Sequence, residues 1–142
     1  MTETTQVSAM PIVTLSNGLR VANFSSPHSF EFEDGTVLPA CEEERAKETQ
    51  LNKVERETPH AVLEGVVDVS LVFEMSDVCR AALEEAEALA EKGDVDIILV
   101  PFPVREALCR ERGVASLAGT PFRVILTKDR VTRTVFTSRF CV

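Results

Sequence analysis

The chain has 142 residues, of which 44% are hydrophobic and 27% charged, a composition typical of a globular protein that is neither disordered nor fibrous. Its longest nearly continuous apolar run, residues 95–104, is far shorter than the roughly 20 residues that cross a bilayer, and residues 1–10 lack the basic start and apolar centre of a signal peptide. Because the net charge is −8, nucleic acid is also an unfavourable partner, and we expect a cytoplasmic protein that binds neither membranes nor nucleic acid.

Two short β-hairpins are expected in the first third of the chain. The first pairs residues 11–15 with residues 19–24 around an Asn-Gly turn, in which both residues tolerate positive φ. The second pairs residues 30–33, which alternate apolar and polar side chains, with residues 36–38 around an Asp-Gly turn. The pattern leaves open whether these hairpins extend a larger sheet or cover one of its faces.

A surface helix and a loop are predicted next. Residues 40–54 are rich in helix-forming side chains and carry acidic residues in the first turn, where the helix dipole favours them. Their apolar stripe is thin, so the helix is expected on the surface. Residues 55–65 are charged, contain Pro59 and follow neither the helical nor the strand period, which predicts an internal loop.

The pattern is clearer in the middle of the chain. Residues 67–73 read as a strand, and Ser76 is a suitable N-cap for a helix over residues 77–92, which Gly93 ends. One face of this helix is apolar, as in a helix that packs on a sheet. Residues 94–100 then include four consecutive apolar side chains, which predicts a central strand that is covered on both faces.

One more helix and two strands complete the pattern. Pro103 opens the helix at a position where a missing N–H costs nothing, and Gly113 closes it. Residues 122–127 and 131–140 are predicted strands that flank Lys128-Asp129-Arg130.

These elements predict an α/β fold. Its centre is a mostly parallel sheet from two consecutive strand-helix-strand units with right-handed crossovers, to which an antiparallel C-terminal hairpin and the N-terminal β-hairpins are added. Residues 1–10 are expected to form a flexible N-terminal tail, and residues 11–142 a single α/β domain.

The loops at the carboxyl ends of the strands are the first place to look for a ligand site. In open parallel sheets ligands bind beyond these ends, so the loops at residues 74–77, 101–103 and 128–130 are expected to face one rim. Two helices begin there, and free N–H groups at helix N-termini attract anions. The alternative for Ser76 and Asp77 is that they only cap their helix.

Basic residues are concentrated at the C-terminal end. Residues 1–104 carry 7 basic and 20 acidic side chains (net −13), whereas residues 105–142 carry 8 and 3 (net +5). Arginine binds phosphates and carboxylates with two parallel hydrogen bonds, so an anionic ligand or an acidic protein surface would fit this quarter. The alternative is that the arginines pair with the acidic helices of the same chain or of a second copy. The candidate ligand-binding residues are Ser76, Asp77, Arg105, Lys128, Arg130 and Arg133.

Little in the sequence favours catalysis. His28 follows Ser25 and Ser26 closely, and Cys41 lies near a predicted helix start, so a His/Ser or His/Cys enzyme is an alternative. No known nucleophile or nucleotide-binding motif is present, and neither a cofactor nor a metal site is expected. The cysteines are far apart, which argues against a disulfide framework, and Cys79 and Cys109 are expected in the core.

Three functional hypotheses follow. The first is a non-enzymatic binding protein for an anionic, phosphate-bearing ligand such as a nucleotide. The second is a structural or adaptor protein that acts through self-association or a protein partner, with an acidic helix and the basic last strand as its two surfaces in a homo-oligomer. The small His/Ser or His/Cys enzyme is the third.

Overall fold

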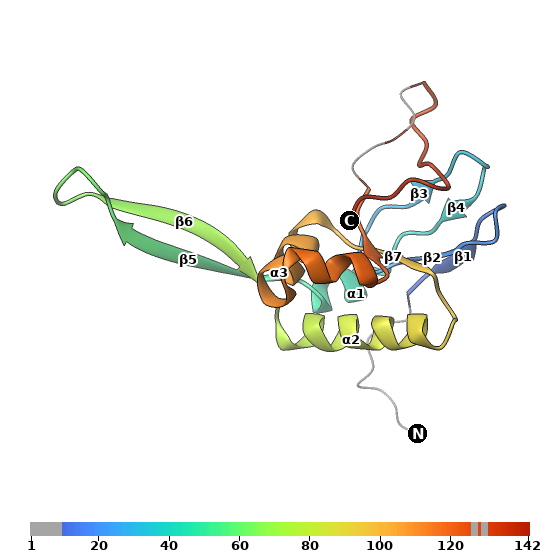
Figure 1. Cartoon of the computed structure of the whole chain (residues 1–142), viewed down its shortest axis with the longest axis horizontal. Helices are drawn as coiled ribbons and strands as arrows, with labels where there is room; N and C mark the ends of the chain where they lie inside the picture. Colours follow the sequence, from blue (N-terminus) through green and yellow to red (C-terminus); the bar gives the residue numbers. More distant parts are fainter. Residues whose placement is uncertain (1–9, 126–127, 129–130) are drawn as a thin grey trace.

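A mixed four-stranded sheet lies at the centre of the protein. The computed structural model describes residues 10–125, 128 and 131–142, so most of the predicted tail lies outside the described residues. The sheet has the order β1-β2-β7-β8, with bounds Ile12–Thr14, Arg20–Asn23, Ile97–Leu99 and Phe122–Arg123. β7 pairs in parallel with both β2 and β8, which confirms that it is an inner strand (Figure 1).

Both predicted N-terminal hairpins are present. β1 pairs antiparallel with β2, and Gly18 adopts the positive φ of 90° that the turn between them requires. β3 (Phe30–Glu31) pairs antiparallel with β4 (Val37–Leu38) around Gly35. The first hairpin extends the central sheet, whereas the second forms a separate two-stranded sheet.

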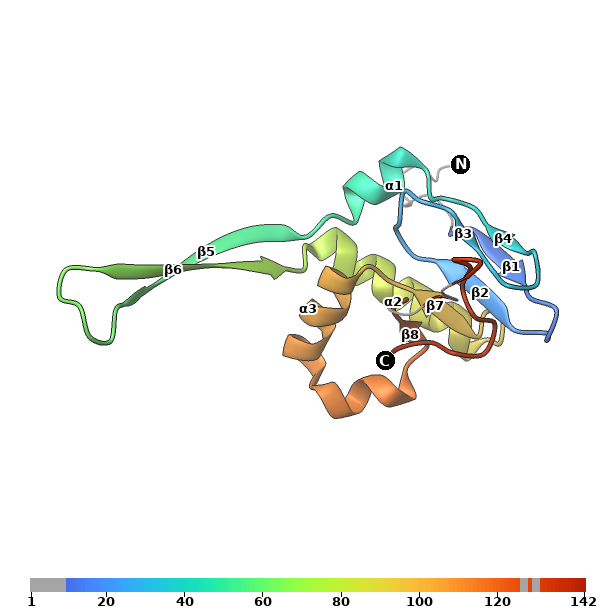
Figure 2. The same ribbon diagram turned by 90° about the horizontal axis from the view of Figure 1, so that it is seen from above.

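The two faces of the central sheet bury two different cores. Ala22 and Ile98 belong to one core together with side chains of α2 (Asp77–Glu91), α3 (Phe102–Arg112) and the 3-10 turn η1 (Val114–Gly119). On the opposite face, Val21 and Leu99 belong to a second core with Leu38 of β4 and Val135 of the C-terminal segment. The sheet is therefore a middle layer between helices and a hairpin (Figure 2).

The ends of the two long helices agree with the sequence signals. Ser76 caps α2, because its hydroxyl oxygen accepts a hydrogen bond from the Cys79 amide at 3.1 Å. Gly93 and Gly113 follow α2 and α3 and adopt positive φ angles of 86° and 88°. Cys79 is buried as predicted, whereas Cys109 on α3 is only partly buried.

The predicted helix over residues 40–54 is wrong at both ends. α1 covers only Glu43–Glu48, and strand β5 begins at Asn52, inside the range predicted to be helical. One face of α1 is buried and not on the surface as predicted. Arg45 is 4% exposed, and Thr49, which directly follows the helix, is 2% exposed. The Thr49 hydroxyl donates to the Arg45 carbonyl at 2.8 Å. The sequence signal failed here because local propensity is overridden by tertiary context, and pairing with β6 holds residues 52–54 in a strand.

The predicted loop over residues 55–65 is wrong for its first half. β5 (Asn52–Pro59) pairs antiparallel with β6 (Val67–Glu74) over eight residue pairs, and only residues 60–66 connect the two strands. β5 has polar side chains on both faces and therefore no apolar alternation to reveal it. Its backbone bonds to β6 hold it extended. We call residues 52–74 the β5–β6 ribbon.

The first of the two predicted strand-helix-strand units is also wrong. β6 pairs with β5 in a separate sheet, so α2 does not connect two strands of the central sheet, whereas β7-α3-β8 does connect parallel neighbours. The predicted strand over residues 131–140 is not present in the described part of that segment, where Val135 makes isolated bridges to Phe32 and Lys128. Cys141 makes a single antiparallel bridge to Val124, in place of the predicted edge hairpin.

Candidate functional site

The β5–β6 ribbon projects from the rest of the molecule (Figures 1 and 2). None of its residues belongs to either core as a buried member. It nevertheless carries half of the exposed large hydrophobic side chains in the described part of the chain. These are Val62, Leu63, Val66, Val67, Val69, Leu71 and Phe73. An apolar surface of this kind on a projecting element marks an interaction site more often than a monomer surface.

Four of the five apolar side chains of β6 share one face of the ribbon. Side chains alternate between the two faces of a strand, so residues 67, 69, 71 and 73 point the same way. Val67, Val69, Leu71 and Phe73 are 50%, 58%, 51% and 43% exposed. We call these four residues the β6 stripe. On the same face β5 contributes their cross-strand partners Pro59, Glu57, Glu55 and Lys53.

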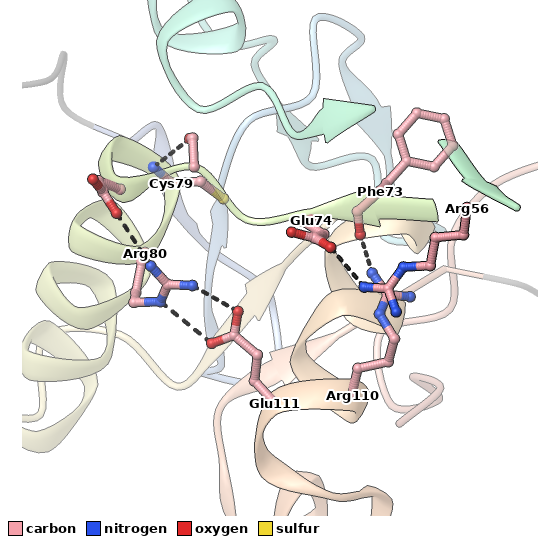
Figure 3. Close-up of polar contacts among 9 residues, drawn as sticks. Arg56, Phe73, Glu74, Cys79, Arg80, Arg110 and Glu111 are labelled. Carbon is pink, nitrogen blue, oxygen red and sulfur yellow. Dashed lines mark hydrogen bonds and ion pairs between the residues drawn. The ribbon is translucent and has the colours of Figure 1, made fainter. Parts of the chain in front are cut away.

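One hydrogen bond joins the base of the ribbon to the body, and an ion pair lies within the ribbon beside it. A guanidinium N–H of Arg110 on α3 donates to the Phe73 carbonyl, and Arg56 Nη2 lies 2.8 Å from Glu74 Oε1 within the ribbon (Figure 3). In Figure 3 the Phe73 ring points away from Arg110, while its carbonyl points toward that arginine. α3 therefore fixes where the ribbon starts.

A second ion pair joins the two helices beside this base. Arg80 Nη2 on α2 lies 2.8 Å from Glu111 Oε2 on α3, and Arg80 Nη1 lies 3.4 Å from Asp77 Oδ1 (Figure 3). The hydrogen bond from Arg80 lowers the pKa of the Glu111 carboxyl. Between the pair and the ribbon lies a cavity of about 230 Å³, lined by Arg56, Glu74, Met75, Arg80, Ala107, Arg110 and Glu111.

Another cavity, of about 290 Å³, lies at the carboxyl ends of the parallel strands. Leu99 and Val100 at the end of β7, Val124 after β8 and Ser26 after β2 contribute to its wall, together with His28 and Phe102. Its lining is largely apolar. A ligand pocket at this end of a parallel sheet was expected, but the loop at residues 74–77 is not part of it.

The predicted ligand-binding residues lie on several elements. Ser76 and Asp77 are at the start of α2, where Ser76 caps the helix and Asp77 contacts Arg80. Arg105 lies on α3, where its guanidinium is 2.7 Å from Glu106 Oε1 and donates to the Val142 carbonyl at 3.0 Å.

The remaining predicted residues are in the C-terminal segment. Lys128 is exposed and bridges to Val135, while Arg133 is exposed with a positive φ of 60°. Arg130 lies outside the described residues. No contact within residues 10–125, 128 and 131–142 joins Ser76, Arg105, Lys128 and Arg133, so their shared role in anion binding stays a prediction.

Several other arginines of the basic quarter bind groups of the protein itself. Arg112 Nη1 is 3.1 Å from Glu87 Oε1 on α2, as the ion-pair alternative predicts. Arg123 donates to several backbone carbonyls, among them that of Thr120 at 2.7 Å. Arg139 lies over the Phe136 ring at 4.9 Å.

The candidate catalytic groups differ in exposure. His28 is exposed at the strand-end cavity, whereas Ser25 is buried and Cys41 is 7% exposed. The Cys41 thiol donates to the Asn23 carbonyl at 3.1 Å, and burial raises its pKa. A raised pKa disfavours the thiolate form that a nucleophile needs.

Sequence reasoning missed the residues of the ribbon. A signal was available, because residues 67–71 alternate apolar side chains with Asp68 and Ser70 before Val72 interrupts the pattern, and alternation is typical of a half-exposed antiparallel strand rather than of a buried parallel one. Arg56 and Arg110 could not be found, since their roles depend on how the ribbon meets α3.

In the described part of the chain, no helix is long and apolar enough to span a bilayer, and no group of three histidine, cysteine or acidic side chains is arranged to hold a metal ion. Comparisons of the chain with protein-family models, with curated proteins and with solved structures found no match.

Proposed function

We propose that this is a non-enzymatic adaptor or structural protein whose β5–β6 ribbon binds a protein chain by strand addition at the edge of β6. The observation that supports the proposal is the β6 stripe: four apolar side chains that are 43–58% exposed on an element that projects from the body. Strand addition combines backbone hydrogen bonds with contacts to alternate side chains, and β6 offers both.

The orientation of the backbone supports addition at β6. In an antiparallel ladder every second residue points its N–H and C=O toward the partner strand, and the others point outward. The Phe73 carbonyl points away from β5, since it accepts a hydrogen bond from Arg110 of α3. The Val66 carbonyl points toward the other side of the ribbon, where it accepts from the His60 amide at 2.9 Å. By the same alternation Val67, Val69 and Leu71 point outward.

These outward groups are open to a partner. No hydrogen bond from outside the ribbon reaches the backbone of Val67, Val69 or Leu71 among the residues that the structure describes. Their side chains belong to the β6 stripe, so a strand added here would gain backbone bonds and apolar contacts from the same residues. An unpaired apolar edge strand is a template for another chain.

The two edges of the ribbon differ sharply, which supports a specific function for one of them. The outward-pointing residues of β5 are Lys53, Glu55, Glu57 and Pro59. Charged side chains and proline are the features by which proteins protect sheet edges from pairing. The corresponding residues of β6 are all apolar and include no proline.

Photocrosslinking in the cells from which the protein comes tests this proposal. A benzoylphenylalanine at Leu71, which is 51% exposed, is expected to form a covalent adduct with a protein chain. The matched control is the same group at Val37 on β4, which is 50% exposed and lies outside the ribbon. If position 71 forms no more adduct than position 37, the proposal is wrong.

A further inference from the structure

We propose that the chain which pairs with β6 is β6 of a second copy, in an antiparallel register centred on Val69 across a twofold axis. This inference rests on the proposed function and names the partner for it.

The base contact limits the length of the new ladder. The Phe73 carbonyl is already bound by Arg110, so the outward residues that remain are Val67, Val69 and Leu71. Val69 is the middle one of these three residues, so an antiparallel pair of β6 strands can be symmetric about it. Only the register centred on Val69 uses all three in both copies and leaves both Arg110 contacts in place.

The side chains are self-complementary in this register. Val69 faces its own counterpart, and Val67 faces Leu71 of the other copy, so apolar side chains meet apolar ones on the stripe face. On the opposite face Asp68 lies across from Ser70, and no like charges are directly opposed. Shifting the centre to residue 68 would place Asp68 against Asp68, and centring it on residue 71 would place Asp68 against Glu74.

The protected edge explains why the assembly would stop at two copies. Pairing through β6 creates a four-stranded antiparallel sheet, in which both outer strands are β5. Their outward residues Lys53, Glu55, Glu57 and Pro59 do not favour another strand. A twofold interface of this kind is closed, because each copy uses the same surface once.

A charge swap at Val69 tests the register. Sedimentation velocity of the full chain at about 100 μM, where a micromolar complex is largely formed, should show a dimer for the parent protein. Val69→Lys and Val69→Glu each place like charges together at the twofold axis, and each should weaken association at least about tenfold. An equimolar mixture should recover the dimer, because lysine then faces glutamate.

The controls separate contact between copies from effects within one ribbon. Val37→Lys replaces another exposed valine, on β4, and should leave the dimer unchanged. Within one chain residue 69 lies across from Glu57, so lysine there is attracted to Glu57 and glutamate is repelled by it. Mixing the two variants does not change these contacts inside each ribbon. Recovery of the dimer on mixing therefore reports the contact between copies. Circular dichroism checks that both variants fold, as expected for a side chain that is 58% exposed.

Each outcome decides the inference. If Val69→Lys alone still dimerises like the parent, or if the mixture stays monomeric, the register is wrong. If the parent is a monomer while the group at Leu71 captures a different protein in cells, the self-pairing inference falls and the proposed function stands. If the parent is a monomer and position 71 captures nothing, both fall.

Discussion

Asn23 is a buried polar residue whose side chain joins several parts of the local backbone. It is fully buried at the end of β2, and its side-chain amide donates to the carbonyls of Ser26, Pro39 and His28 at 3.1, 3.0 and 3.3 Å. Its Oδ1 accepts from the Ser26 amide at 2.9 Å. One side chain thus satisfies four backbone groups and shapes the loop that carries His28.

We expect Asn23→Ala to lower the free energy of unfolding by about 3 kcal/mol, because it leaves buried backbone groups without partners. Urea unfolding followed by far-UV circular dichroism would measure this, since the chain has no Trp or Tyr for fluorescence. The control is Asn17→Ala in the exposed β1–β2 turn, which should cost less than about 1 kcal/mol. Equal costs for the two variants would contradict this role of Asn23.

Asp34 should make stability depend on pH. Its carboxylate accepts from the Ser16 amide at 2.8 Å and from the Thr36 amide at 2.9 Å, and these backbone hydrogen bonds hold its pKa well below the ordinary value of 3.8. A depressed folded-state pKa stabilises the protein above the unfolded-state pKa, and this contribution is lost as the pH falls through the folded-state pKa. Asp34→Ala should therefore destabilise the protein more near pH 7 than at about pH 3. Unfolding curves at the two pH values would show it, and a cost that does not change with pH would exclude it.

At the scale of elements, the predictable parts of the fold were those with local signals. Asn17-Gly18 predicted the first hairpin, and Ser76 with Gly93 predicted the bounds of α2, because turn and cap residues act within a few positions. β5 was not predictable, since its charged side chains resemble those of a surface helix or loop. The pairing of β6 with β5 rather than with β7 is a long-range choice on which local periodicity has no bearing.

The ribbon should be dispensable for folding of the body. Val54 and Val72 are cross-strand partners whose backbone groups point toward each other, so Asn-Gly in place of residues 55–71 can join them in a tight turn. Because none of the removed residues is a buried member of either core, the free energy of unfolding should stay within about 1 kcal/mol of the parent value, while association is lost. Thermal unfolding by circular dichroism and sedimentation would measure the two effects. Loss of the folded body would show that the ribbon is structural.

At the scale of the whole molecule, the two modes of self-association differ in their response to salt. The charge asymmetry of the sequence predicted head-to-tail contacts between acidic and basic surfaces, whereas the β6 stripe favours apolar contacts and backbone hydrogen bonds. At about 1 M sodium chloride the Debye length is near 3 Å, so contacts between exposed charges weaken greatly. We expect the dimer to persist at this concentration in sedimentation velocity. Dissociation by salt would instead favour the charged surfaces.

Of the two candidate sites, the strand-end cavity could be predicted from the sequence, whereas the binding edge of the ribbon could not. The strand-end cavity follows from a general property of parallel sheets, and the structure places His28 and Phe102 there. The contrast between the two ribbon edges required the register of β5 and β6, because only the register shows which residues point outward.

Hydrogen exchange of the Val69 amide tests the central claim most directly. This amide points outward from the ribbon, so it is exposed to solvent in a monomer and hydrogen-bonded once a strand is added at β6. The account predicts that its exchange slows as the protein concentration rises, while exchange of amides in the β1–β2 turn does not change. Fast exchange of the Val69 amide at every concentration, with the ribbon otherwise protected, would contradict the pairing of β6 with a second copy.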